Sequence, residues 1–389
     1  MSLARIARYL VTALPNAKAL KGSSTWDSRR HKAISVVLHR LFRKVDGGLV
    51  EPGGLPTTGI HRVLVCRPNH RLGNSVLIGP LIAEIETLYP GAEIDVLGSA
   101  ATECLYAGRF RIHTIFVLPH TIVRHLWRSA RVLHALHRCR YDLAIDACEG
   151  SQSGRIALAM AQATYKLGFP DSGLNVASAW HGLRWPDHLA QRGVFLLRHA
   201  YAGSTRAAYP TLSLEVTPEE TRDAATVLAQ VCALVPGPCV ATVGIFANAT
   251  GAKCYSENWW KQFVDTFQSL CPQVRLVDML AAHGQSQLGS RFAPFYSRNL
   301  RRLTAAISCM DAFISADCGV MHLAAASGTP TLGMFAVTDP AKYAPYGGAS
   351  AALDTRAMDA GTAATAAAKW CTRAVPACQI SESVRDVAA

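Results

Sequence analysis

Residues 311–346 read DAFISADCGVMHLAAASGTPTLGMFAVTDPAKYAPY: an apolar run, a polar turn, a run of small residues, a second turn and another apolar run. This order predicts a strand at 312–315, a helix that carries His322 and a strand at 331–335. A glycine and a proline follow the small residues and end the helix. Strand, helix and parallel strand form a βαβ unit, so the stretch predicts an α/β fold.

The turn between the first strand and the helix holds Asp317, Cys318 and Gly319. Where a helix begins, unpaired backbone N–H groups and the positive end of the helix dipole favour a bound phosphate. The small residues of the helix let it approach the sheet closely. A structural unit without a ligand accounts for the same residues, so both interpretations stay open at this point.

The same alternation of apolar strands and amphipathic helices runs through most of the chain. It predicts two doubly wound, Rossmann-like α/β domains that face a cleft, with ligands at the carboxyl ends of the strands. A single helix is predicted over 75–89. Residues 170–212 lack this periodicity and are predicted to be irregular. No G-x-G-x-x-G follows a predicted strand, which argues against a dinucleotide oxidoreductase. The other strands are predicted at 61–66, 93–98, 112–118, 141–147, 165–169, 239–246 and 274–280.

A Gly/Pro-rich stretch at 47–59 reads as a linker, and the folded body is predicted to begin after it. Thr217, Pro218 and Glu220 form a helix start that leads into the second domain. The predicted organisation is a basic N-terminal extension, an acceptor domain, a nucleotide-sugar domain and a helical tail that packs back on the first domain. Their predicted limits are 1–59, 60–215, 216–350 and 351–389.

The chain carries a net charge of +12, and residues 1–60 hold ten Lys or Arg against three acidic residues. Such a segment is attracted to anionic lipid by about 1 kcal/mol per basic residue near the surface. No nucleic-acid motif or aromatic series accompanies it, so we expect a membrane surface and no nucleic acid as its partner. A solvated basic extension is the alternative.

The hydropathy pattern contains no run of the length that spans a membrane. Pro15 and Asn16 interrupt the apolar residues near the start, so a signal peptide is not predicted and the expected location is the cytoplasm. The twelve cysteines include no C-x-x-C pair and read as small buried residues in a reducing compartment. Neither a metal nor a cofactor is predicted.

The 311–346 stretch resembles the signature of glycosyltransferase family 9, the bacterial heptosyltransferases. The resemblance covers about residues 60–387, with a weak part at 170–235. It implies the GT-B architecture and direct displacement at the anomeric carbon with inversion, without a metal. The matching residues of the signature are Asp317, Cys318, Gly319, His322, Leu323, Gly328, Thr329, Pro330, Thr338, Asp339, Pro340, Pro345, Tyr346 and Gly347.

The first loop, RPNHRLGN at 67–74, resembles the opening motif of that family, where a Gly-Asp pair supplies the general base. Asn74 stands at the position of that acid, and a neutral amide is a poor proton acceptor near pH 7. Three alternatives follow. His70 or Asp317 acts as the base, Asn74 only holds the acceptor hydroxyl while its proton leaves late, or the chain is catalytically silent.

The segment ATGAKCYSENWW at 249–260 resembles the nucleotide-binding loop of the family. The resemblance implies that Lys253 neutralises the departing diphosphate and that Thr250 supplies a hydrogen bond. It also implies that Asp317 contacts the donor sugar. The remaining implied donor contacts are backbone N–H groups of Cys318 and Gly319, with His322 either on the diphosphate or packed beneath the loop.

Acceptor contacts are predicted from the opening loop, at Arg67, Arg71 and Gly73. Together with Arg124, Arg128 and Arg131 the two arginines form a basic face suited to an anionic, lipid-linked glycan. Asp146 or Glu149, after the strand at 141–147, either faces the cleft or caps the next helix.

The predicted function is transfer of a heptose or related sugar from an ADP-sugar to a lipopolysaccharide core acceptor. The expected place is the cytoplasm, with peripheral contact with the inner-membrane surface. One alternative is a protein O-heptosyltransferase that uses the same donor. Another, motivated by Asn74, is a non-catalytic homologue that binds a sugar nucleotide or glycan.

Overall fold

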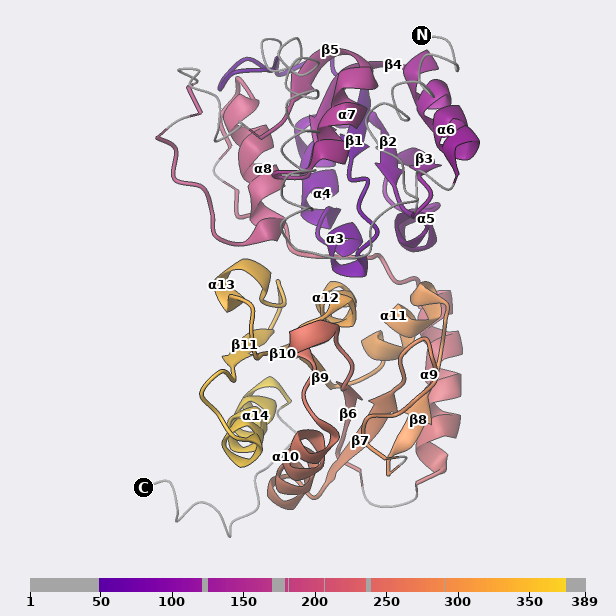
Figure 1. The fold of residues 1–389 in the computed structure, drawn as a ribbon, viewed down its shortest axis with the longest axis vertical. Coiled ribbons are helices and arrows are strands. Elements are labelled where there is room, and N and C mark those ends of the chain that lie inside the picture. The colour runs from indigo at the N-terminus through magenta and orange to yellow at the C-terminus, as the bar shows by residue number, and fades with distance from the viewer. Residues whose placement is uncertain are drawn as a thin grey trace, which may run out of the picture. The chain divides into compact units, whose positions relative to one another are not determined.

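The structure is a computed structural model that describes residues 49–120, 125–169, 179–180, 182–205, 207–235, 239–289 and 291–375 (Figure 1). These residues form two compact units. Unit 1 takes the described residues up to His70, with Leu81–Trp185 and Arg192–Ala208, and unit 2 takes Arg71–Pro80, Pro186–Gln191 and the residues from Tyr209 onward. Most of the predicted N-terminal extension and residues 376–389 lie outside the described ranges.

Unit 1 contains a five-stranded parallel sheet in the order β3-β2-β1-β4-β5. The chain adds strands on one side of β1 and then on the other, so the order reverses between β1 and β4. Val63, Leu64 and Val65 of β1 are fully buried because helices cover both faces of the sheet. The strands are β1 (Arg62–Cys66), β2 (Glu93–Gly98), β3 (Ile112–Val117), β4 (Arg140–Asp146) and β5 (Gln162–Leu167).

The helices of unit 1 start at local signals in the sequence. Ser99 caps α5 in a reciprocal pair with Thr102, and the Ser151 hydroxyl accepts the N–H of Gly154 at the start of α7. The helices are α4 (Gly79–Leu88), α5 (Ala100–Tyr106), α6 (Leu126–Arg138), α7 (Gln152–Met160) and α8 (Leu189–Ala200), of which α4 and α8 each begin in unit 2.

Unit 2 contains a six-stranded parallel sheet in the order β11-β10-β9-β6-β7-β8. Its order reverses between β6 and β9. The strands are β6 (Ala241–Phe246), β7 (Val274–Met279), β8 (Ala293–Phe295), β9 (Ala312–Ala316), β10 (Thr331–Phe335) and β11 (Ala351–Asp354). The helices are α3 (Leu72–Val76), α9 (Pro218–Ala233), the 3-10 turn η1 (Gly251–Lys253), α10 (Glu257–Leu270), α11 (Leu300–Ser308), α12 (Gly319–Ala326), α13 (Pro340–Tyr343) and α14 (Ala360–Ala374).

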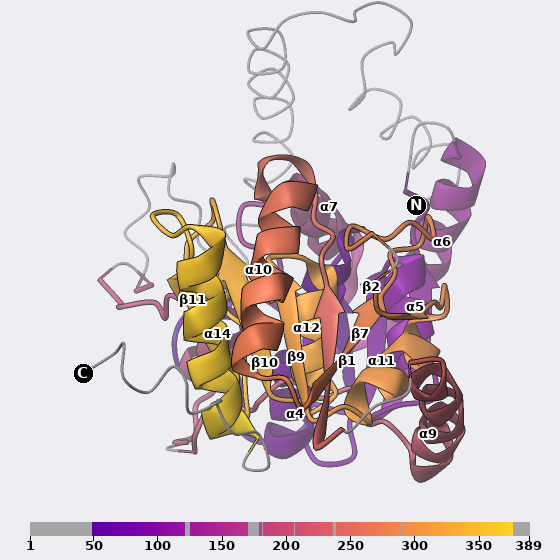
Figure 2. The same ribbon diagram turned by 90° about the horizontal axis from the view of Figure 1, so that it is seen from below.

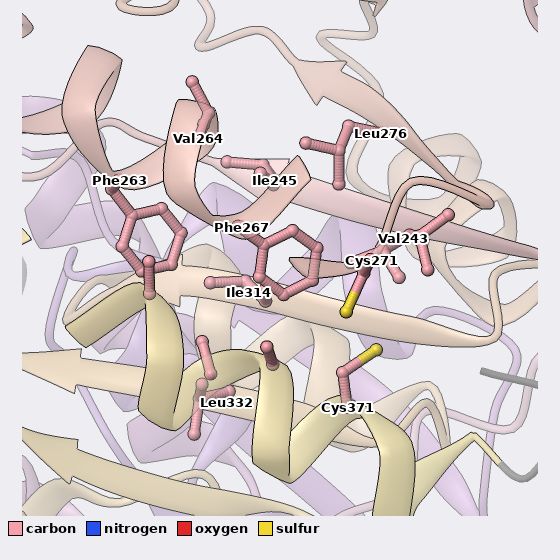
Figure 3. Close-up of a cluster of buried hydrophobic side chains, with 14 of the residues drawn as sticks. Val243, Ile245, Phe263, Val264, Phe267, Cys271, Leu276, Ile314, Leu332 and Cys371 are labelled. Atoms are coloured by element: carbon pink, nitrogen blue, oxygen red, sulfur yellow. The ribbon is translucent and has the colours of Figure 1, made fainter. Parts of the chain in front are cut away.

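The core of unit 2 lies between its sheet and the pair α10 and α14, which run side by side (Figure 2). Phe263 and Phe267 of α10 point toward α14 and toward strand residues such as Ile314 (Figure 3). Five alanines of α14 are buried, and their small side chains let the helix approach this aromatic face: Ala360, Ala363, Ala364, Ala367 and Ala368. The described part of the predicted tail, β11 and α14, therefore packs within unit 2. Residues 376–389, where the helix that packs back on the first domain was predicted, lie outside the described residues.

The predicted fold class is confirmed, since both units are parallel sheets of a doubly wound α/β type. The predicted βαβ unit is present as β9, α12 and β10. Three segments that were predicted in the first domain belong to unit 2: Arg71–Pro80, Pro186–Gln191 and Tyr209–Glu215. The described residues 49–59, predicted as a linker, belong to unit 1. No helix among the described residues is both long and apolar enough to cross a bilayer.

Two helical predictions need correction. The region 170–212 contains α8, although Gly193 weakens helix propensity by about 1 kcal/mol. A Cβ at Gly193 would lie 3.3 Å from Leu81 Cδ2, so glycine allows α8 to pack closely in unit 1. A single helix was expected over 75–89, but the chain forms α3 and α4, with Pro80 in the first turn of α4.

Candidate active site

The order of strands in unit 2 reverses between β6 and β9, and this position brings two loops together. The loop after β6 leads into η1 and the loop after β9 leads into α12. Ligands of doubly wound folds bind at the carboxyl ends of the strands at such a reversal. Lys253 Nζ, from the first loop, lies 2.6 Å from Asp317 Oδ2, from the second.

Asp317 is held from three directions. Its backbone N–H donates to Met334 O at 3.0 Å, and the Thr338 hydroxyl donates to the same Oδ2 that Lys253 contacts. Asp317 is only 4% exposed, and a buried carboxylate needs a cation and hydrogen bonds to remain charged. Lys253 and Thr338 meet that need, which fixes the position of the carboxylate at the end of β9.

The Lys253 side chain is 31% exposed, so its ammonium can meet a ligand from solvent while it contacts Asp317. It also lies 5.7 Å from the ring centre of Tyr343. Gly251 starts the η1 turn with φ of +63°, a conformation that glycine adopts without strain. Thr250 precedes this turn and is exposed.

The first turn of α12 offers backbone donors. Its N-cap residue, Cys318, makes no capping hydrogen bond through its side chain. At the first N–H groups of a helix an anion is favoured by the helix dipole. Cys318 and Gly319 form the start of α12, next in sequence to Asp317.

Two glycines bring α3 against α12. A Cβ at Gly73 would lie 2.8 Å from His322 Cδ2, and a Cβ at Gly319 would lie 2.7 Å from Leu72 Cβ and 3.0 Å from Gly73 N. Any side chain at either position would push the helices apart. This contact lies within unit 2 and places Asn74, which is partly buried, in the helix beside α12.

His322 is buried in α12, with 4% of its surface exposed. Burial lowers its pKa to about 4; Asp317 opposes this shift, and His188 and Lys253 add to it. The ring is therefore neutral near pH 7 and adds no positive charge for a diphosphate. Its Nδ1 has no hydrogen-bond partner among the described residues.

This buried ring predicts a pH dependence of unit 2 stability. The unfolded chain protonates His322 near pH 6.5, whereas the folded chain does so only near pH 4. Stability is therefore full above pH 6.5 and falls by up to about 3 kcal/mol as the pH drops to about 4. We expect a smaller fall in His322→Asn than in wild type, measured by hydrogen exchange of β9 and α12 amides. His283→Asn, at an exposed histidine of unit 2, should keep the full fall; identical slopes in both variants would contradict the assignment.

His188 belongs to the same unit and was not found from the sequence. Its Nδ1 accepts the Ala190 N–H at 3.2 Å, so Nε2 carries the proton and donates to Ala344 O at 2.9 Å. Burial lowers its pKa, so the ring stays neutral. It stacks on Tyr346 with ring centres 4.8 Å apart, which ties residues 186–191 to the Pro-Tyr-Gly part of the signature. No local pattern marks His188, although Tyr346 was part of the resemblance.

Arg67 and His70 lie in unit 1, after the carboxyl end of β1. One Arg67 guanidinium nitrogen donates to Ala147 O, which follows β4. The His70 ring lies 4.8 Å from that of His120, and burial followed by the effect of His120 lowers the pKa of His70. Arg71 is exposed and belongs to unit 2.

Asp146 ends β4 and is 3% exposed. Its Oδ1 accepts the N–H of Cys148 at 2.9 Å, and burial raises its pKa to about 7. The cap of α7 is Ser151, so Asp146 is not the capping residue. A Cβ at Gly154 would overlap the Asp146 carboxylate, so glycine allows α7 to lie against it.

The remaining predicted residues lie in unit 1 or outside the described ranges. Glu149 forms an ion pair with Arg192 within unit 1, and Arg128 and Arg131 are exposed on α6. Arg124 lies outside the described residues. Within the described ranges, no three His, Cys, Asp or Glu side chains are grouped as a metal site would require.

Comparisons with known proteins give a consistent result. The model of glycosyltransferase family 9 (heptosyltransferase) matches residues 129–358. A lipopolysaccharide core heptosyltransferase, OpsX of Haemophilus influenzae, is 46% identical over 48 residues, which are 12% of this chain and only 14% of that relative.

Three solved structures share the fold. Escherichia coli ADP-heptose lps heptosyltransferase II and E. coli heptosyltransferase WaaC with ADP each have a TM-score of 0.60 and 16% identity, over 80% of this chain and 99% of theirs. A family 9 glycosyl transferase from Veillonella parvula has a TM-score of 0.59 and 18% identity, over 76% of this chain and 86% of its own. The predicted GT-B architecture is confirmed at the level of fold. Because the family model covers more than half of the chain, the protein belongs to glycosyltransferase family 9, the heptosyltransferases.

Proposed function

We propose that the protein transfers heptose from ADP-heptose to a lipopolysaccharide core acceptor at the cytoplasmic face of the inner membrane. The observation that carries this proposal is the contact of Lys253 with Asp317 at the strand reversal of unit 2, beside the start of α12. A cation and a helix start suit a diphosphate, and a carboxylate suits sugar hydroxyls.

The donor is expected to lie with its diphosphate on Lys253, Thr250 and the backbone of Cys318 and Gly319. The acceptor oxygen would form a bond to the anomeric carbon while the bond between that carbon and the β-phosphate oxygen breaks. The electron pair of the broken bond would leave with ADP. Lys253 and the helix start would stabilise that developing charge without a metal. E. coli WaaC has been solved with ADP and with ADP-2-deoxy-2-fluoro heptose, which supports an ADP-sugar as the donor.

A base must take the proton of the acceptor hydroxyl, and Asn74 is a poor acceptor. Asp317 is ion-paired with Lys253, and the pKa of His322 is too low for an effective base near pH 7. The pKa of His70 is lowered, so its ring is neutral and able to accept a proton at pH 7. We infer that His70 is the base, with Arg67, Arg71 and Gly73 in the acceptor-binding loop.

Asn74 also motivates a second candidate function. A chain that keeps the Lys253–Asp317 pair but lacks the acid of the opening motif fits a protein that binds the sugar nucleotide without transferring the sugar. The variant Asn74→Asp restores the acid and separates the two functions. Only a protein that binds the sugar nucleotide without transferring the sugar would gain turnover from this substitution.

The test is mass-resolved turnover of ADP-heptose by the purified protein with a truncated lipopolysaccharide core. Product from the native protein is the expected result. Silence of the native protein with activity in Asn74→Asp would support the binding function. If neither the native protein nor Asn74→Asp forms product although ADP-heptose binds, the lipopolysaccharide core is not the acceptor. Exported proteins are then the acceptors to assay.

A further inference from the structure

Helix α6 of unit 1 has two chemically distinct faces. It connects β3 with β4 and covers the sheet, where Ala130, Leu133 and Leu136 are buried in a core with strand residues such as Leu64 (Figure 1). Its other face is exposed and carries Trp127, Arg128, Arg131, Ala135 and Arg138. At about 100° per residue these five positions fall within an arc of about 100°.

The exposed face combines an aromatic ring with unpaired positive charge. Trp127 is 72% exposed, which is unusual for the largest apolar side chain. Arg128, Arg131 and Arg138 form no ion pair or hydrogen bond through their guanidinium groups among the described residues. Helix α6 contains no acidic residue, so nothing within it offsets these three charges.

We infer that this face, Trp127 with Arg128, Arg131 and Arg138, docks the protein on a bilayer of anionic phospholipids. Tryptophan is favoured at the level of lipid headgroups, because its ring is apolar and its N–H is polar. Arginines on the same face bind the negative surface of the leaflet. Charge complementarity and the exposed ring together select a lipid surface as the partner.

The position of α6 gives this contact a consequence for the acceptor. Because α6 follows the parallel strand β3, it begins at the carboxyl edge of the unit 1 sheet, and Trp127 lies in its first turn. Arg67 follows β1 and Asp146 ends β4 at the same edge. Docking through the start of α6 would bring this edge to the bilayer. The inference goes beyond the proposed function and does not depend on it.

The test is binding of the full chain to vesicles of phosphatidylethanolamine and phosphatidylglycerol, with phosphatidylcholine vesicles as the uncharged reference. Each arginine near the surface contributes about fivefold to partitioning, equal to about 1 kcal/mol. The variant R128Q/R131Q/R138Q is therefore expected to bind about a hundredfold more weakly. Because these three arginines are exposed, the variant is expected to fold. Unchanged circular dichroism and Tm would verify this.

The matched control removes three exposed charges from helices of unit 2, as R222Q/K261Q/R302Q. Both variants have the same net charge and keep the basic residues near the N-terminus, so only the position of the lost charge differs. Equal binding by the two variants would overturn the inference.

A second readout concerns the ring itself. Brominated phosphatidylglycerol vesicles should quench part of the tryptophan fluorescence of the native protein, and Trp127→Phe should lose that part. Equal quenching in both proteins would overturn the proposed contact. So would mass measurements in which Trp127→Phe abolishes self-association, because the face would then bind a second copy of the chain.

Discussion

Replacing Lys253 by alanine is expected to lower kcat/KM for heptose transfer by about 10²–10³-fold, the loss that follows removal of one preorganised partner of a developing charge. The Lys253 ammonium lies 2.6 Å from Asp317 Oδ2 and is 31% exposed, so it is both positioned and accessible. A diphosphate that leaves without this cation would carry uncompensated charge in the transition state. ADP affinity should fall as well, because the product bears the same diphosphate.

Lys261→Ala is the matched control, since Lys261 is an exposed lysine of the neighbouring helix α10. It should leave both kcat/KM and ADP affinity unchanged. Lys253→Ala also removes the cation from a buried carboxylate, so its Tm must be measured beside its kinetics. A folded Lys253→Ala protein with wild-type ADP affinity would exclude Lys253 from the donor site.

His70→Gln is expected to lower kcat by about 10²-fold or more with little change in ADP affinity, since a general base acts on the chemical step. Glutamine keeps a hydrogen-bonding side chain but cannot take the acceptor proton near pH 7. The control is His61→Gln. His61 is exposed and precedes β1, whereas His70 follows the carboxyl end of that strand.

The pH profile provides an independent check of the same residue. Burial and His120 lower the pKa of His70, so the neutral form persists below pH 6.5. The acid limb of kcat/KM, which reports the free enzyme, is therefore expected below pH 6.5, and it should be absent from His70→Gln. If His70→Gln retained both the wild-type rate and the limb, a late proton transfer with Asn74 holding the hydroxyl would be the better account.

The sequence predicted the regular parts of both units because their signals are local. The βαβ unit of β9, α12 and β10 follows from apolar runs separated by small residues and turns. Helix starts such as α9, with its cap Thr217, proline and Glu220, are decided by groups three residues apart. Resemblance to a family then connected two short motifs to a donor site.

Other features could not be predicted, because they depend on contacts between distant segments. Helix α8 was missed since Gly193 weakens its local signal and close packing against Leu81 compensates for it. The assignment of α3 to unit 2 depends on Gly73 and Gly319. A glycine in the sequence does not indicate which segment it will contact. His188 has no sequence signal, since its bonds to Ala190 and Ala344 and its stack on Tyr346 arise only in the fold.

The sequence by itself determined the residue types of the proposed donor site, Lys253 and Asp317 among them, and the parallel α/β class, because strand and helix periodicities are properties of consecutive residues. Only the tertiary structure decided which of those residues meet. The strand order of unit 2 puts the ends of β6 and β9 side by side, and this brings the ammonium of Lys253 to the carboxylate of Asp317. Burial, which sets the pKa of His322 and Asp146, likewise depends on which segments cover a side chain.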